Sequence, residues 1–225
     1  MGIFDNLKRS KQRKMYLYSA QELEEYESFV SENLGEYQQV LHEIVSPDIH
    51  LDIITIPPSA ETPFYTLVTM GMGAYSMQVP RELKKHRLEH AELLLYLPAD
   101  WNLHSSDERD YWPIRYLKIL ARLPLQCNTW LGYSHTVHAN EDMAPLADNT
   151  QLNSFVLLNG RNRQGEELDL QLSSGKKIHF YQLFPLYQEE LEYDFNHSLE
   201  DLLDLFIEDF DIISPIDISR KNYGL

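Results

Sequence analysis

The segment NTWLGYSHTVHANED, residues 128–142, holds the residue types from which hydrolytic sites are built. Ser134 lies within GYSHT, which differs by one residue from the GxSxG turn that carries a serine nucleophile. That turn needs small residues on both sides of the serine and a helix directly after it. Here Thr136 replaces the second glycine, and the following residues are typical of a loop that ends at Pro145. The sequence therefore argues against a serine nucleophile.

The same segment offers four candidate metal ligands, His135, His138, Glu141 and Asp142. Histidines three residues apart point to opposite faces of a strand, whereas the zincin motif places its two histidines four apart on a helix. The sequence predicts neither the helix nor the longer spacing here. We therefore expect these side chains to be ordinary loop and core residues rather than metal ligands.

Other catalytic patterns are missing as well. The glycines of GMGAYS, residues 71–76, lack a third glycine and a following helix, so they do not form a phosphate-binding loop. Glu189 and Glu190 are adjacent on a predicted helix and diverge, so they do not form an acid/base pair. We expect a protein that is not an enzyme and that needs no metal or cofactor. A hydrolase or metalloenzyme that uses residues 134–142 is the least favoured alternative.

Composition narrows the class of partner. The 225 residues include 43% hydrophobic residues, enough for the core of one sizeable domain. A net charge of −16 and a pI near 4.9 disfavour nucleic acid and favour a basic protein partner, although an acidic surface also serves solubility alone. The single cysteine, Cys127, excludes an internal disulfide. Because the sequence lacks both a signal peptide and an apolar run of about 18 residues, we expect a cytoplasmic protein without a membrane segment.

Hydrophobic periodicity predicts several helices. A long amphipathic helix is expected over residues 19–45, behind a capping box formed by Ser19 and Glu22. Three further helices are expected at residues 111–124, 186–195 and 198–210. Pro124 is expected to end the first of these three.

Short runs rich in Ile, Val, Thr and Tyr predict strands between the helices. These runs lie at residues 50–59, 64–73, 90–101, 128–134, 153–160 and 176–186. The polar stretch 161–175 is expected to be a loop, and residues 1–15, which are rich in Lys and Arg, a mobile basic tail. Since no repeat or linker interrupts the rest, residues 16–225 are predicted to form one α+β domain, a mixed β-sheet with packed helices.

Three long blocks resemble a known family. They are AELLLYLPADW at residues 91–101, YWPIRYLKILARLPLQCNTWLGYSHT at residues 111–136 and FYQLFPLYQEELEY at residues 180–193. In order and spacing they resemble the suppressor of fused family, specifically its bacterial members, over roughly residues 85–220. The resemblance implies a fold like the N-terminal domain of that family. We expect the tryptophans of these blocks to lie in the core: Trp101, Trp112 and Trp130.

The resemblance implies a binding protein. The animal member of the family is a scaffold that holds a short extended peptide of a transcription factor, and many bacterial members look like immunity proteins that neutralise polymorphic toxins. In the animal member an acidic residue precedes the histidine that matches His135, and a tyrosine follows the pair that matches Ala121 and Arg122; both serve the peptide site. This chain has Ser134 and Leu123 there, so the binding mode of the animal member does not transfer directly.

An acidic run near the C-terminus indicates the chemistry of the partner. Residues 189–211 include ten Asp or Glu and no Lys or Arg. The leucines and phenylalanines of the run can turn inward, which leaves a helix face of uncompensated charge. Such a face steers a basic protein toward it, for instance a nuclease toxin with a positive active cleft. The expected contact residues are Leu123, Ser134, His135, His138, Glu141, Asp142, Glu189, Asp194, Glu200 and Asp204.

Two hypotheses about function follow. The first is a protein-binding module that neutralises a toxin C-terminal domain with a basic surface. The second is a scaffold or regulator that sequesters an endogenous protein or an extended peptide.

Overall fold

One β-sheet of eight strands organises the molecule. The computed structural model describes residues 15–43, 45–46, 48–138, 142–207 and 213–225. The strands are β1 (Gln39–Leu41), β2 (Asp52–Ile56), β3 (Phe64–Met70), β4 (His90–Pro98), β5 (Thr136–His138), β6 (Ser154–Asn159), β7 (Asp169–Gln171) and β8 (Lys177–Leu186). The helices are α1 (Ala20–Asn33), α2 (Glu108–Cys127), α3 (Gln188–Asn196) and α4 (Leu199–Phe206), with the 3₁₀ helices η1 (Met72–Ala74) and η2 (Arg81–His86).

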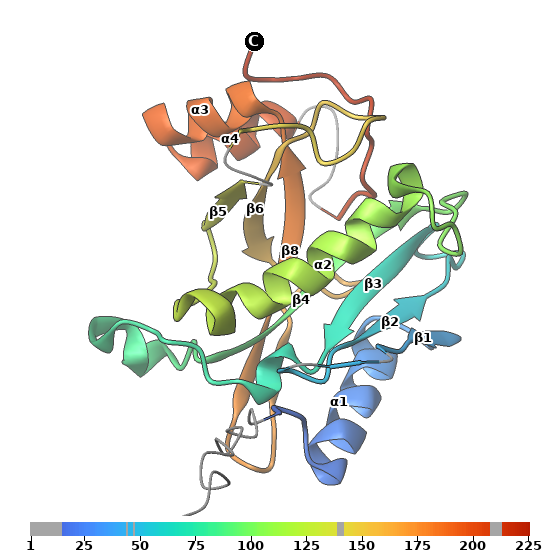
Figure 1. Ribbon diagram of the computed structural model, residues 1–225, viewed down its shortest axis with the longest axis vertical. Coiled ribbons are helices and arrows are strands. Elements are labelled where there is room, and N and C mark those ends of the chain that lie inside the picture. The colour runs from blue at the N-terminus through green and yellow to red at the C-terminus, as the bar shows by residue number, and fades with distance from the viewer. Residues whose placement is uncertain (1–14, 44, 47, 139–141, 208–212) are drawn as a thin grey trace, which may run out of the picture.

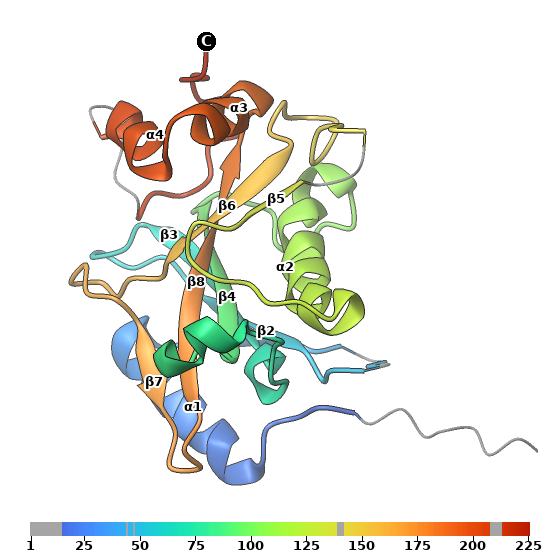
Figure 2. The same cartoon turned by 90° about the vertical axis from the view of Figure 1, so that its left-hand side faces the viewer.

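The strand order makes the sheet a mixed one. The order is β1-β2-β3-β4-β8-β6-β5, and β7 pairs with β8 off this path. All pairs are antiparallel except β4 with β8, which are parallel. α1 covers one face of the sheet and α2 the other, while α3 and α4 pack against β6 and β8 at the far end from α1 (Figures 1 and 2). The predicted class, a single α+β domain with a mixed sheet and packed helices, is confirmed.

The first helix begins where the sequence predicts and ends much earlier. Ser19 and Glu22 form the predicted capping box, in which each side chain accepts a hydrogen bond from the other residue's backbone N–H. The helix ends at Asn33 because Gly35 adopts φ 121°, a left-handed conformation that favours glycine. Strand β1 follows, so the prediction of one helix over residues 19–45 is wrong.

Three predictions near the middle of the chain are also wrong. α2 continues past Pro124 to Cys127 because a proline lacks only the N–H donor, and its carbonyl still accepts a hydrogen bond from the N–H of Asn128. The helix ends at Asn128, whose φ of 51° is left-handed. Residues 128–134, predicted as a strand, form a loop, and the strand β5 comes after them. The polar stretch 161–175, predicted as a loop, contains the short strand β7, which pairs with β8.

The tryptophans divide between the core and its edge. Trp112 on α2 is fully buried, as predicted. Trp101 and Trp130 pack against the same core, as predicted, but they lie at its edge and stay partly exposed. Trp130 is less buried than Trp112 because it lies in a loop at the edge of the sheet instead of a strand.

Among the described residues, no helix is both long enough and apolar enough to cross a membrane. The tail predicted at residues 1–15 lies outside the described residues, apart from Met15.

A buried carboxylate joins four parts of the chain. Glu92 on β4 is fully buried and accepts hydrogen bonds from the Tyr18 hydroxyl at 2.7 Å, the Thr69 hydroxyl at 2.5 Å, and the backbone N–H groups of Gly71 and Gly73, both at 2.9 Å. A side chain at Gly73 would collide with the Tyr18 hydroxyl, so glycine is needed for this close approach. The glycines of GMGAYS, which the sequence excluded as a phosphate loop, thus have a structural role.

The buried carboxylate should make stability depend on pH. Burial raises the pKa of Glu92 from 4.5 to about 7, although its hydrogen bonds act in the opposite direction. Between these values the folded state holds a proton that the unfolded chain releases, so the free energy of unfolding should fall as pH rises, by up to about 1.4 kcal/mol per pH unit. Glu92→Gln removes this titration, so the difference in stability between the wild type and this variant should become smaller as pH rises from 5 to 8. Urea denaturation at both pH values measures this, and parallel profiles of the two proteins would contradict it.

Candidate functional site

A groove at the β5 edge of the sheet brings together four of the predicted contact residues. Leu123 on the last turns of α2 and Ser134, His135 and His138 around β5 line a groove of about 830 Å³. The rest of the lining is largely apolar and comes from the loop 129–131, β5 and Met143. Leu123 lies 11 residues before Ser134, and the end of α2 and the loop after it bring the two residues to the same groove.

Ser134 occupies a strained turn without the other parts of a nucleophile site. Its φ is 62°, a left-handed conformation that is uncommon for serine. Its backbone N–H donates to the carbonyl of Leu157 at 2.8 Å, which fixes the loop against β6. The strand β5 follows instead of a helix, and in the described residues no base is hydrogen-bonded to its hydroxyl. Gly132, the first glycine of GYSHT, is explained by the Trp130 ring, which leaves no space for a side chain there.

The two histidines of the segment have different surroundings. The His135 ring packs edge-on against Trp130, with 4.2 Å between ring centroids, and burial lowers the pKa of His135. His138, at the end of β5, is exposed, and so is Asp142. Glu141 lies outside the described residues. In the part of the chain that the structure describes, no three His, Cys, Asp or Glu side chains converge as metal ligands.

Among the described residues, strand β5 has a paired neighbour on one side only, which leaves its other edge open beside the groove. It is the last strand in the sheet order, and its three residues pair with β6 on one side only. An edge strand presents backbone N–H and C=O groups that can pair with an extended segment of another chain. The groove therefore combines apolar side chains with the backbone N–H and C=O groups of an edge strand.

An acidic face borders this loop. Glu200 and Asp204 are exposed on α4, and Asp194 on α3 is half-buried. Burial raises the pKa of Asp194, and the neighbouring Glu200 carboxylate adds to the rise. Burial also raises the pKa of Tyr133, and the nearby Glu200 carboxylate adds to that rise too. The acidic face of α3 and α4 therefore reaches the loop that lines the groove.

The first carboxylates of the acidic run serve the fold instead. Glu190 is fully buried and forms a two-oxygen ion pair with Arg220, at 2.5 Å for each oxygen. Glu189 accepts a hydrogen bond from the side-chain amide of Asn222 at 2.7 Å. The prediction of an uncompensated run is therefore wrong for Glu190, because the cation comes from a later part of the chain.

Sequence reasoning missed the exposed apolar side chains of this region. Phe195 at the end of α3 is 65% exposed, Ile207 after α4 is 69% exposed, and Tyr133 is 41% exposed. Exposed aromatic side chains surrounded by charge are typical anchors of protein interfaces. Phe195 was missed because it lies in the acidic run, where the sequence indicated that leucines and phenylalanines turn inward.

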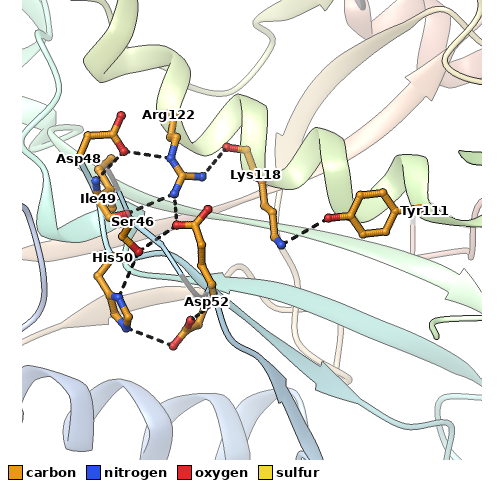
Figure 3. A network of polar contacts seen from close by, with 9 residues as sticks. Ser46, Asp48, Ile49, His50, Asp52, Tyr111, Lys118 and Arg122 are labelled. Carbon is orange, nitrogen blue, oxygen red and sulfur yellow. Dashed lines mark hydrogen bonds and ion pairs between the residues drawn. The ribbon is translucent and has the colours of Figure 1, made fainter. Parts of the chain in front are cut away.

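Arg122 is turned away from the groove that its neighbour Leu123 lines. Figure 3 shows it reaching from α2 to the segment before β2, where its guanidinium binds the carboxylates of Glu43 and Asp48, the latter at 3.0 Å. It also donates to the Ile49 carbonyl at 3.2 Å. Consecutive residues on a helix point about 100° apart, so one side chain anchors the helix while the next faces the groove.

Comparisons with known proteins agree on one family. The family model described as Suppressor of fused protein (SUFU) matches residues 47–221. A SUFU homologue from Neisseria gonorrhoeae FA 1090 has a similar structure, with a TM-score of 0.62, 16% sequence identity, and coverage of 90% of this chain and 96% of that chain. No curated protein matches the sequence.

Two further solved structures share the fold. The structure of the Sufu-Fu complex matches with a TM-score of 0.59 and 12% identity, over 84% of each chain. The Drosophila Suppressor of Fused matches with a TM-score of 0.56 and 10% identity, over 89% of this chain and 50% of that one.

Proposed function

Because the chain belongs to the suppressor of fused family, we propose that it is a cytoplasmic immunity protein that neutralises a toxin domain by direct binding. The observation that carries the proposal is the groove at the β5 edge, bordered by the acidic face of α3 and α4. A relative of the same fold is known in complex with the protein Fu, which supports a protein partner. The proposal includes no catalytic step.

Charge and shape have separate tasks in this proposal. The acidic face attracts a basic toxin surface over distances of about 10 Å at 0.1 M salt. The groove and the exposed Tyr133 and Phe195 then exclude water from the docked contact. Occupying a basic cleft of the toxin would also block its substrate, so a single contact suffices for capture and inhibition.

The free edge of β5 favours a second candidate, a scaffold that holds an extended peptide of an endogenous protein. A peptide laid in the groove could pair with Thr136–His138 and place alternate side chains against Leu123 and Trp130. The neighbouring reading frame separates the candidates. An immunity protein should be encoded beside a large secreted protein with a variable C-terminal domain, and that domain, produced separately, should form a one-to-one complex with this chain.

Charge reversal on the acidic face should slow association. In Glu200→Lys/Asp204→Lys we expect the association rate with the basic toxin domain to fall about tenfold at low salt, and its salt dependence to weaken. Both residues are exposed, so folding stability should change little. Stopped-flow mixing at several salt concentrations measures the rate. Glu189 is left unchanged because it binds Asn222.

The matched control reverses the same charge elsewhere. Glu24 and Glu32 are exposed on α1, at the opposite end of the molecule from α3 and α4 (Figure 1). Glu24→Lys/Glu32→Lys should slow association far less than the α4 variant. Equal rates for the two double variants would mean that only net charge matters and that the interface lies elsewhere.

A further inference from the structure

A cleft of opposite charge lies away from the acidic face. The net charge of the chain is −16, but η2 and the turn between β7 and β8 bring several cations together. Both elements lie in the half of the molecule away from α3 and α4 (Figure 2). The cleft between them has a volume of about 430 Å³. Its charged lining consists of Lys84, Arg87, Lys176, Lys177 and a single carboxylate, Glu89.

Arg87 is positioned by acceptors that do not neutralise it. Its guanidinium donates to the side-chain oxygen of Gln171 at 2.9 Å and to the backbone carbonyl of Gly175 at 2.5 Å. Its backbone is left-handed, with φ 57°, and its carbonyl accepts a hydrogen bond from the His179 ring at 3.1 Å. Since these partners carry no carboxylate, the positive charge is held at a fixed place and remains available to an anion.

Lys84 supplies a second unneutralised charge. Within the described ranges its side-chain ammonium takes part in no ion pair or hydrogen bond, although its backbone carbonyl accepts from the Arg87 N–H, and the side chain lines the cleft. Lys176 and Lys177 are different, since they pair with Glu22 at 2.9 Å and with Asp169 at 2.7 Å. The cleft therefore holds two free cations on a background of paired ones.

We propose that this cleft binds the phosphate group of a small ligand. A phosphate monoester carries close to two negative charges at pH 7 and three strong acceptor oxygens, so it matches Lys84 and Arg87 better than a single carboxylate does. A large polyanion such as nucleic acid is disfavoured, because the acidic remainder of the chain repels it. A small ligand inside the cleft is screened from those charges over about 10 Å at 0.1 M salt. The site is separate from the groove at β5 and does not depend on the toxin hypothesis.

The test is a titration of the isotope-labelled protein with inorganic phosphate, followed through backbone N–H signals in nuclear magnetic resonance spectra at low ionic strength. We expect saturable shifts at residues 84–90 and 174–177. Lys84→Gln should weaken phosphate binding about tenfold, because the variant loses one charge-assisted hydrogen bond to the ligand. Lys85→Gln is the matched control, because Lys85 is the next residue of η2, is exposed, and does not line the cleft. It should change the affinity less than twofold.

Several outcomes would overturn the proposal. Equal weakening by the two lysine variants would mean general charge attraction only. Shifts centred on the basic residues before Met15, or no saturation by phosphate, would exclude the cleft as the site. Acetate that binds as tightly as phosphate, or single-stranded DNA that binds the cleft more tightly, would exclude the proposed class of ligand.

Discussion

Replacing Glu92 with alanine is expected to lower the free energy of unfolding by about 3–5 kcal/mol. The carboxylate is fully buried and receives two hydroxyl and two backbone N–H donors. Its removal leaves the N–H groups of Gly71 and Gly73 buried without an acceptor, each at a cost of about 1–3 kcal/mol. Urea denaturation followed by circular dichroism measures the loss.

The matched control for this variant is Glu82→Ala. Glu82 is exposed on η2, so its change should stay within about 0.5 kcal/mol. Should Glu92→Ala fail to fold, Glu92→Gln, which keeps one acceptor for the glycine N–H groups, should still fold and rank between the wild type and the alanine variant. A loss below about 1 kcal/mol for Glu92→Ala would show that the network adds little to stability.

Placing a charge in the groove should affect partner binding more than any change on the acidic face. For Leu123→Glu we expect dissociation of the toxin complex to accelerate about 100-fold, equivalent to about 2.7 kcal/mol. Leu123 lines the groove, so in the complex a carboxylate there would lose water without gaining a partner. Surface plasmon resonance with the immobilised toxin domain measures the dissociation rate.

Leu17→Glu adds the same charge at a distant site. Leu17 is 54% exposed and lies just before α1, at the other end of the molecule from α3 and α4. It should leave the dissociation rate within about twofold of the wild type. An unchanged rate for Leu123→Glu would remove the groove from the interface and leave the acidic face as the remaining candidate.

Patterns that depend on near neighbours in the chain were readable from the sequence. The capping box of Ser19 and Glu22 is set by residues three apart, and the strands β2, β3, β4, β6 and β8 lie inside the predicted ranges because local hydrophobic runs define them. The long blocks around Trp112 indicated the family because their spacing is unusual, and the family model confirmed it. The helix predicted past Gly35 failed because periodicity alone continues through a glycine whose backbone turns left-handed.

Only the tertiary structure decided which distant residues meet. The carboxylate of Glu92 meets the hydroxyl of Tyr18, 74 positions earlier in the chain, and no local pattern encodes that contact. Arg220 neutralises Glu190 across 30 positions of the chain, so the charge of the acidic run could not be judged from the run itself. Likewise, the sequence shows that Glu92 is polar, but not which groups offset the free-energy cost of burying it. The hydrogen-bond donors to its carboxylate come from β3, η1 and the segment before α1. The free energy of each contact depends on burial and distance in space, and both are properties of the folded chain.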